Sequence, residues 1–494
     1  MRVGNRRARS GVGAAMRGRL GIGWIRSSCP WVLWLGLGCG GTSGTPADAG
    51  LEPPASTPVA AAVECPTEPL DATVAPGTRP EHRDVEHWLA KLAPGQADEV
   101  LVPPAAVAEL NARSSEVEGA WRDPFDPSLA DPTAVTPGLT ERMGYLRAAV
   151  DEGRMVEGEA GSLAAAHAIE LRAATADELR LVAEEAPLWC VALDTGLYRP
   201  PVDPAFDRNR CASLHPGELV RVLRRSEDES WLYVHSGHTT GWLHRPSLTP
   251  PLPAAHLRPL WEGPRLVPLR DDVRTEGGRR LRLGTKVPVV GQGPASAESG
   301  DVRRVLVPTP EGLVEDTVRI DAAGSRVSEG VLPLTRRNLW TLALAEQDTP
   351  YGWGGTGGNR DCSRLVHDVM ASFGIEMARH SGVQAKQGTR SIDVSARSEE
   401  AKLAELRRQA QRGAVLLHMP GHIMIYLGEE DGQHYAVSAI SEYLVPCSGG
   451  PDTVVRIGRV AVTTLELGRG SERTAYIERL ATLVVFAPSG GFAL

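Results

Sequence analysis

The sequence predicts an α+β protein of several domains: a small helical segment, two consecutive β-rich segments, and a C-terminal segment with both helices and strands. Three observations lead to this prediction. The chain has 494 residues, more than a single domain with one hydrophobic core usually contains. Its composition, 42% hydrophobic and 23% charged residues, is ordinary for globular domains. Short strand-like runs separated by polar turns occupy the middle of the chain. Beyond residue 333, helical periodicity alternates with apolar strands.

The N-terminus predicts export through a signal peptide at 1–39. Residues 1–38 hold seven Arg and no Asp or Glu, and their apolar run at 31–38 is too short to span a bilayer. Cys39 directly follows small residues, which resembles the lipobox of bacterial lipoproteins and implies a lipid on Cys39. Ordinary secretion is the alternative, and Met16 is an alternative start to Met1. We expect a membrane-anchored protein that faces the periplasm or cell envelope.

A linker and a helical module are expected next. Residues 40–81 are mostly Gly, Thr, Ser, Pro and Ala with little apolar periodicity, which predicts a flexible linker. Helical spacing follows at 87–92 and 139–150, between proline-rich breaks. We therefore predict a small helical module over 82–160.

Two β-rich segments follow, over 161–250 and 251–332. The first has strand-like runs at 219–223, 231–234 and 240–243, separated by polar turns. Its order of strand, charged turn and Trp-containing strands resembles the SH3-like barrels of bacterial cell-wall proteins. A second SH3-like barrel is predicted from the runs at 266–269, 286–290 and 302–307. We expect the barrel aromatic residues to be core, with ligand binding as the alternative.

The catalytic segment, 333–494, contains a candidate nucleophile. A glycine-rich stretch at 349–361 leads into Cys362, and apolar residues then recur at helical spacing up to Phe373. Cys362 is therefore expected in the first turn of a helix, where free N–H groups and the helix dipole stabilise a thiolate. For a lone cysteine, a buried structural residue is the alternative. A nucleophilic role requires a histidine within reach.

His422 is the candidate base. It stands at the start of an apolar strand at 422–428, and a turn at 429–432 leads to a return strand at 435–439. A histidine on a sheet edge that faces a cysteine at a helix N-terminus can take the thiol proton and return it to a leaving amine. This arrangement is typical of papain-like cysteine hydrolases.

Several motifs together resemble the NlpC-type family of papain-like bacterial cell-wall cysteine peptidases. The resemblance extends to its members with an N-terminal helical module and two SH3-like barrels. The motifs are 350–355, 360–363, 373–375, 379–381 with Gln384, and 421–428. The resemblance implies a papain-like α+β catalytic domain that cleaves peptidoglycan stem peptides, commonly between γ-D-Glu and the diamino acid.

The same resemblance implies roles for individual residues. Cys362 would be the nucleophile and His422 the base, with Tyr351, Trp353, Asp361 and Ser363 in the substrate pocket. Asp361 would pair with the free amine of an N-terminal L-Ala, and the first barrel would restrict the pocket to such peptides. Arg364 stands where the family often has a small residue, so we expect it to affect access to the pocket.

The third catalytic residue differs from the family's usual histidine. Alignment of the return strand puts Ser438 in its place. If 431–432 is a two-residue turn, His422 lies opposite Ser441, and a four-residue turn puts it opposite Ala439. His434 lies five to seven residues from that level, roughly 17–24 Å along the strand, and cannot orient His422. Ser438 and Ser441 are therefore the candidates.

The cysteines predict one free thiol and no metal site. Seven cysteines show neither a C-x-x-C pair nor metal-ligand spacing, and five remain beyond residue 39. An odd count in an exported protein leaves at least one unpaired. Cys190 and Cys211 are candidates for a disulfide, and we expect Cys362 to be free. No metal or other cofactor is expected.

Other functions are excluded or kept as an alternative. No Lys–Arg cluster is interleaved with aromatic residues, so no nucleic-acid partner is expected. The glycine-rich stretch lacks a following Gly-Lys-Ser/Thr, which argues against a nucleotide site. The alternative to a peptidase is a cell-wall-binding lipoprotein whose barrels bind and whose hydrolase domain is weakened or inactive. The oligomeric state stays open.

Overall fold

The structure is a computed structural model, and all residues that it describes belong to one compact unit, Ala62–Leu494. It describes 65–158, 163, 166, 171–174, 178–293, 301–320 and 326–488. The predicted signal peptide and the lipidation site Cys39 lie outside the described residues.

A seven-stranded sheet forms the centre of the C-terminal part, in the order β1-β20-β19-β18-β17-β21-β16. Its neighbouring strands are antiparallel except for the parallel pair β1 and β20. The strands are β1 Leu70–Asp71, β16 Arg390–Asp393, β17 Ala414–Met419, β18 His422–Glu430, β19 Gln433–Val445, β20 Thr453–Thr464 and β21 Thr482–Phe486.

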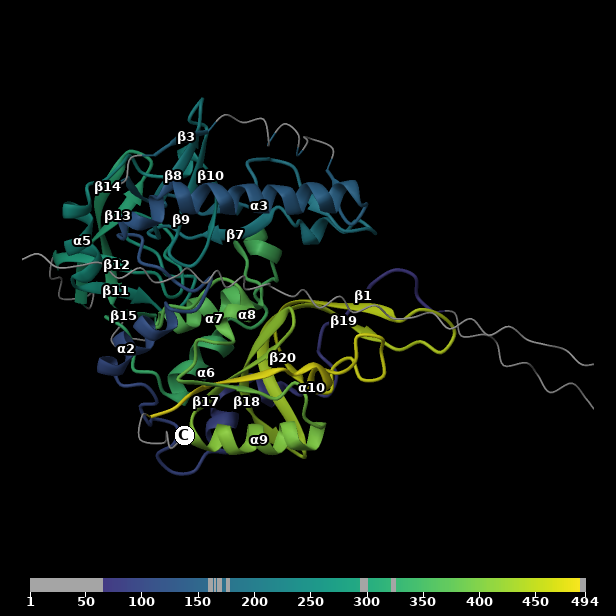
Figure 1. Ribbon diagram of the computed structural model, residues 1–494. Helices are drawn as coiled ribbons and strands as arrows, with labels where there is room; N and C mark the ends of the chain where they lie inside the picture. The colour runs from purple at the N-terminus through teal and green to yellow at the C-terminus, as the bar shows by residue number, and fades with distance from the viewer. Residues whose placement is uncertain are drawn as a thin grey trace, which may run out of the picture. The chain divides into compact units, whose positions relative to one another are not determined.

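The two faces of this sheet support two different hydrophobic cores. Along β18, Ile423 and Ile425 enter the core of α6 and α7, whereas Met424 and Tyr426 enter the core of α9. This alternation follows from the two-residue period of a strand. Figure 1 shows α6 and α7 on one side of the sheet and α9 on the other. The helices are α6 Arg336–Ala345, α7 Cys362–Ala371, α8 Ser381–Gln384, α9 Glu399–Arg412 and α10 Tyr476–Arg479.

The first barrel has the strand order β3-β8-β9-β10-β5-β7, and β4 also pairs with β8. The runs predicted at 219–223, 231–234 and 240–243 all lie in strands. The strands are β3 Leu171–Ala173, β4 Leu179–Leu181, β5 Ala186–Trp189, β7 Arg210–Leu214, β8 Leu219–Ser226, β9 Trp231–His235 and β10 Thr240–His244.

The long helix α3 (Pro132–Asp151) covers the aromatic face of the first barrel, beside β8, β9 and β10 in Figure 1. Trp231, Tyr233 and Trp242 are buried in one cluster with Val135 of α3. These aromatic side chains are therefore core residues, and they do not form an open ligand surface.

The second β-rich segment is a five-stranded sheet in the order β14-β13-β12-β11-β15, with its own valine-rich core. Each of its three predicted runs overlaps a strand. The strands are β11 Arg265–Pro268, β12 Val287–Gln292, β13 Asp301–Thr309, β14 Gly312–Ile320 and β15 Val327–Glu329. Helix α5 (Ala254–Glu262) connects the two barrels, and β2 (Val156–Glu157) pairs with β6 (Leu197–Tyr198).

The helices predicted over 82–160 pack onto two different parts of the molecule. Trp88 of α1 (Val85–Leu89) and Leu110 of α2 (Pro104–Ser114) enter the core that contains α7, whereas α3 packs on the first barrel. The flexible linker predicted over 40–81 differs from the structure in its described part. A disulfide joins Cys65 to Cys447, and β1 pairs with β20, so the chain is fixed to the sheet from residue 65 onward.

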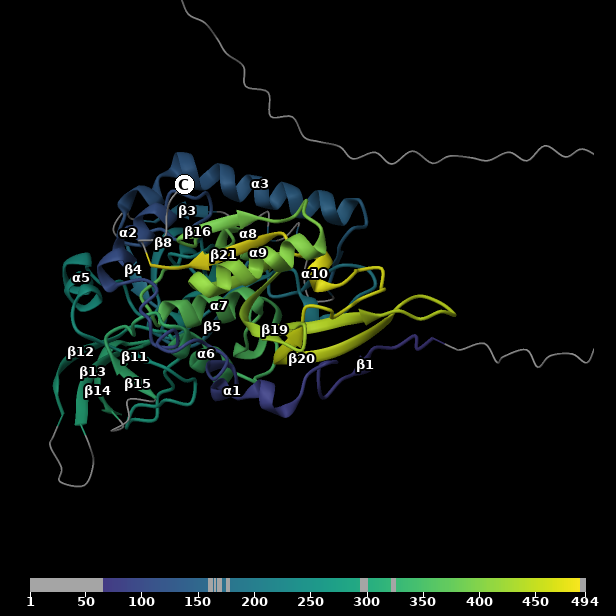
Figure 2. The same ribbon diagram turned by 90° about the horizontal axis from the view of Figure 1, so that it is seen from below.

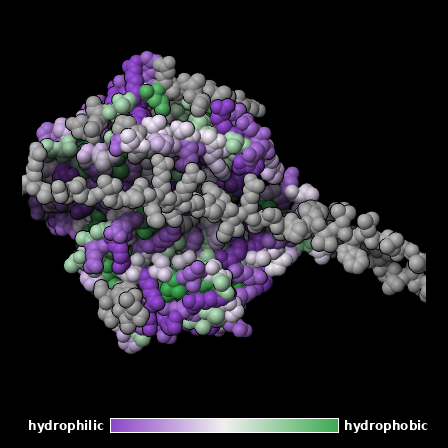
Figure 3. Space-filling view, in the orientation of Figure 1, coloured by the Kyte–Doolittle hydropathy of each residue, from purple (hydrophilic) through white to green (hydrophobic). Residues whose placement is uncertain are grey.

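No helix among the described residues is long and apolar enough to cross a membrane. On the face seen in Figure 3, hydrophobic residues are scattered among hydrophilic ones, as is usual for a globular surface.

Candidate active site

Cys362 is the first residue of α7 and follows the glycine-rich turn η5 (Trp353–Gly358). Gly354 and Gly355 have φ values of 57° and 85°, a left-handed conformation that favours glycine. A Cβ on Gly354 would lie 2.6 Å from the Cβ of Arg210, and one on Gly355 would lie 2.7 Å from the backbone N of Ser213. The glycines therefore allow the turn before Cys362 to contact β7 of the first barrel.

Asp361 caps the N-terminus of α7 and already has several partners. Its Oδ1 accepts hydrogen bonds from the backbone N–H of Arg364 at 2.9 Å and from the Ser363 hydroxyl at 3.1 Å. Arg379 donates to both carboxylate oxygens, and the Gly354 N–H donates to Oδ2 at 3.2 Å. The carboxylate therefore uses about all of its lone-pair sites within the protein.

Cys362 and His422 line one cavity of about 910 Å³. His422 begins β18. The backbone N–H of the next residue, Ile423, donates a hydrogen bond to the Cys362 sulfur. The described side chains include no hydrogen bond between Cys362 and His422. Such nucleophile–base contacts are often loose before substrate binds and tighten in the reacting complex.

Ser438 contacts the other end of the imidazole. His422 Nε2 lies 3.1 Å from Ser438 Oγ, and Ser438 is buried. When Nε2–H donates to this hydroxyl, Nδ1 keeps its lone pair and can act as the base. Ser441, the other candidate, also lines the cavity but has no bond to His422.

The expected position of His422 opposite Ser441 is wrong by one residue. The predicted two-residue turn is present, since Glu430 pairs with Gln433. A bulge between Tyr426 and Gly428 then shifts the register, so that Ile425 pairs with Val437. When this register is continued to the start of β18, His422 lies opposite residue 440. Its side chain is then on the same face of the sheet as that of Ser438.

Both reacting groups are neutral at neutral pH. Burial, followed by the Asp361 carboxylate, raises the pKa of the Cys362 thiol to about 12. Burial and the positive charge of Arg479 lower the pKa of His422 to about 3. The thiolate expected from the helix N-terminus is therefore not favoured, because desolvation penalises the charged form. Proton transfer to His422 has to accompany attack on the substrate.

The remaining predicted pocket residues surround the nucleophile. Tyr351 lines the cavity, and burial together with Asp361 raises its pKa. Trp353 also lines it, and the guanidinium of Arg208 stacks 4.0 Å above its ring. The Ser363 hydroxyl donates to Asp361 and accepts a 2.7 Å bond from Arg379, so it belongs to the network around the N-cap.

Arg364 is turned away from the cavity and is completely buried, so the expected effect on pocket access is wrong. Its guanidinium pairs with Glu218 of the first barrel and with Asp368 on α7, and it donates to the Ser213 carbonyl at 2.8 Å. Two carboxylates and one backbone carbonyl satisfy the buried guanidinium, which explains how an arginine replaces a small residue there.

Arg360 extends this ion network to the second barrel. It pairs with Asp271 at 2.7 Å, with Glu346 at 2.9 Å and with Asp368 at 2.6 Å, and all four side chains are largely buried. Both barrels are therefore connected by charge pairs to the helix that carries the nucleophile.

Three cavity residues were not predicted from the sequence. Arg379 belongs to the family-like motif at 379–381, but nothing in the sequence indicated that it pairs with Asp361. Tyr476 and Arg479 form the ends of α10, and the rings of Tyr476 and His422 lie 5.5 Å apart. No sequence motif marks this short helix.

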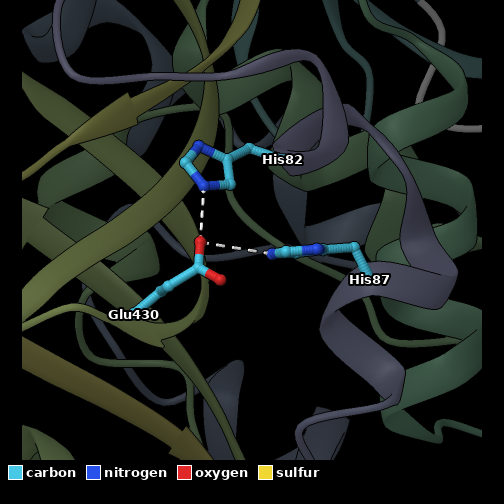
Figure 4. Close-up of side chains that lie close together, drawn as sticks. All are labelled: His82, His87 and Glu430. Atoms are coloured by element: carbon cyan, nitrogen blue, oxygen red, sulfur yellow. Dashed lines mark hydrogen bonds and ion pairs between the residues drawn. The ribbon is translucent and has the colours of Figure 1, made fainter.

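A second cluster, outside the cavity, consists of His82, His87 and Glu430 (Figure 4). Its potential ligand atoms lie within 4.8 Å of one another. However, His82 Nδ1 accepts the Arg79 N–H, so Nε2 carries the proton that bonds to Glu430. Lys91 also pairs with Glu430 at 2.6 Å. These contacts fit an ion cluster that joins the N-terminal segment to the β18–β19 hairpin better than a metal site.

The disulfides leave one free thiol in the described chain. Cys190 and Cys211 are bonded, as are Cys65 and Cys447, and Cys362 is unpaired. Among the described cysteines, the candidate nucleophile Cys362 is therefore a free thiol, and the other four form disulfides.

Comparison with known proteins agrees with this geometry. Residues 348–443 match the model of the NlpC/P60 family, and residues 197–244 match that of the SH3 domain of SH3b1 type. The chain carries an NlpC/P60 domain. The NlpC/P60 match includes Cys362, His422 and Ser438, and it confirms the resemblance seen in the sequence. The match supports a cysteine-peptidase class for this domain.

This chain shares its fold with a solved NlpC/P60 endopeptidase. An NlpC/P60 endopeptidase from Photobacterium damselae subsp. piscicida has a TM-score of 0.64 at 14% identity, over 85% of this chain and 99% of that chain. An NlpC/P60 family protein from Bacillus cereus ATCC 10987 has a TM-score of 0.42 at 17% identity, over 63% of this chain and 100% of that chain. No curated protein sequence matches this chain.

Proposed function

We propose that the protein hydrolyses the bond between γ-D-Glu and the diamino acid in peptidoglycan stem peptides with a free N-terminal L-Ala. The observation that carries this proposal is that Cys362 and His422 of the NlpC/P60 domain line one cavity, while Ser438 is hydrogen-bonded to His422.

The geometry suggests the order of proton transfers. His422 Nδ1 accepts the thiol proton as Cys362 Sγ attacks the carbonyl carbon, and free N–H groups in the first turn of α7 stabilise the oxyanion. The imidazolium then gives its proton to the leaving amine, and a thioester forms. Water, deprotonated by His422, hydrolyses this thioester and restores the thiol.

Recognition of the free amine is assigned to the cavity around Asp361. Phe206 and His238 of the first barrel border the same cavity, which supports a limit on peptide length on that side. Because Asp361 is paired with Arg379, an incoming ammonium group has to replace one of its present donors. This exchange is possible because an ammonium preserves the charge balance of the carboxylate.

The decisive experiment incubates the purified protein with L-Ala-γ-D-Glu-diaminopimelate. We expect release of L-Ala-D-Glu by the wild type and none by Cys362→Ala, followed by liquid chromatography and mass spectrometry. Release by both proteins would contradict the mechanism. Release by neither would favour the alternative, a wall-binding protein without hydrolase activity. Acetylation of the peptide amine should then abolish cleavage if the amine is recognised.

We also propose that the protein is exported and anchored through a lipid on Cys39. The basic segment, the short apolar run and the small residues before Cys39 support this. Metabolic labelling with a radioactive fatty acid should mark the wild type but not Cys39→Ser. Label on both proteins, or on neither, would contradict lipidation at this residue.

A further inference from the structure

Arg479 is a partly buried cation that faces the cavity without a carboxylate partner. Two other arginines of the cavity are paired, Arg379 with Asp361 and Arg473 with Glu442 at 3.2 Å. Within the described part of the chain, no carboxylate lies within ion-pair distance of Arg479, and its buried Nε has no hydrogen-bond partner. Burial also lowers the pKa of Arg479. A partly desolvated guanidinium without a carboxylate within ion-pair distance is costly and is a candidate for binding an anionic ligand.

Tyr476 connects Arg479 to the base. The Arg479 guanidinium carbon lies 5.2 Å from the centre of the Tyr476 ring, and that ring lies 5.5 Å from His422. Arg479 is therefore no farther from His422 than these two steps together. Its charge also contributes to the lowered pKa of His422.

The chemistry of the reaction identifies what occupies this side of the cavity. His422 must give its proton to the leaving nitrogen, so the leaving group lies against His422. Side chains around His422 therefore contact the part of the substrate beyond the scissile bond. In the proposed reaction this part is the diamino acid, whose carboxylates are its negatively charged groups.

From this geometry we propose that Arg479 binds a free carboxylate of the leaving diamino acid and selects substrates that carry one. The inference rests on the proposed function. A guanidinium matches a carboxylate with two parallel N–H···O bonds, which a lysine cannot reproduce. The carboxylate can be the C-terminal one or the one on the diaminopimelate side chain, and substrates distinguish these sources.

The test uses four peptides, L-Ala-γ-D-Glu followed by diaminopimelate or lysine, each with a C-terminal carboxylate or amide. We expect wild-type kcat/KM to fall about 10- to 100-fold when the recognised carboxylate is removed. Arg479→Gln and Arg479→Lys should lose most of this discrimination. Arg473→Gln, a paired arginine of the same cavity, should keep it. A thermal midpoint of Arg479→Gln close to that of the wild type shows that this variant is folded.

Binding separates this inference from the proposed function. Affinities of the four peptides are measured by calorimetry for Cys362→Ala and for the double variant Cys362→Ala/Arg479→Gln. A preference for the carboxylate that only the single variant shows supports the inference even if the wild type cleaves nothing. The inference would be overturned if both Cys362→Ala variants bound the carboxylate-bearing peptides with equal preference. It would also be overturned if the wild type and Arg479→Gln showed equal preference in kcat/KM. In either case the peptidase assignment stands.

Discussion

Ser438 holds His422 Nε2 with a neutral hydroxyl group at 3.1 Å. A hydroxyl fixes the tautomer and the ring orientation, but it adds no negative charge that would stabilise the imidazolium. This agrees with the low pKa of His422, about 3, and with a site whose thiol and imidazole are both neutral before reaction. The histidine is therefore oriented without being made more basic.

Ser438→Ala should lower kcat/KM for the diaminopimelate peptide by about 10-fold, because it removes one neutral hydrogen bond from the base. Ser441→Ala is the matched control, since Ser441 lines the same cavity without bonding to His422. Equal losses in both variants would contradict the orienting role of Ser438. Steady-state kinetics at one pH measure the difference.

The pKa of Cys362, about 12, predicts how its reactivity depends on pH. The thiolate is the reactive form, so the alkylation rate should rise about tenfold per pH unit between pH 7 and 10. Below the pKa no plateau is expected, because the neutral thiol dominates throughout this range. Iodoacetamide labelling measured by mass spectrometry, with Cys362→Ala as background, tests this. A plateau near neutral pH would show a stabilised thiolate instead.

At the scale of elements, the turn η5 and helix α7 decide where the nucleophile lies. The turn requires left-handed glycines, and two of them lie against β7 of the first barrel. Asp361, which caps α7, is bound by Arg379 from the segment before α8. The position of Cys362 therefore depends on the barrel as well as on its own domain.

Gly355→Ala should lower the free energy of unfolding by about 2–4 kcal/mol, from a clash with Ser213 in addition to left-handed strain. Gly357→Ala has similar strain at φ 67°, but its nearest atom is the end of the Asn359 side chain at 3.2 Å. It should cost about 1 kcal/mol. Denaturant unfolding of both variants tests the contact with the barrel, and equal costs would argue against it.

Local patterns in the sequence predict most of these elements but not their connections. The short apolar runs at 219–223, 231–234 and 240–243, separated by polar turns, mark three strands, and Cys362 was expected at a helix start. The register of β18 and β19 was missed by one residue because a bulge leaves no composition signal. Arg379 and Arg479 were missed because only tertiary packing brings them to the cavity.

At the scale of the whole molecule, long-range covalent and ionic contacts join segments that are far apart in the sequence. The disulfide between Cys65 and Cys447 spans 382 residues, and the network around Arg360 and Arg364 includes residues of both barrels. Neither was predictable, since five cysteines and many arginines allow numerous pairings.

Cys447→Ser should destabilise the molecule by about 2–5 kcal/mol, because the disulfide restricts the unfolded chain over a long loop. Dithiothreitol should lower the thermal midpoint of the wild type. It should lower that of Cys447→Ser less, since only the pair Cys190–Cys211 remains to be reduced. Calorimetry measures the thermal midpoint of both proteins, each with and without dithiothreitol. An equal response of both proteins would show that Cys65–Cys447 adds no stability.

The Cys65–Cys447 disulfide also determines how the molecule carries mechanical tension. A pull on residue 65 passes through the sulfur–sulfur bond directly to Cys447, next to the end of β19. The 381 residues between the two cysteines form a closed ring, which is bypassed when the tension acts between residue 65 and the chain beyond Cys447. The nucleophile and both barrels lie within this ring, so a substrate held at Cys362 would load the ring through both of its ends, at Cys65 and at Cys447.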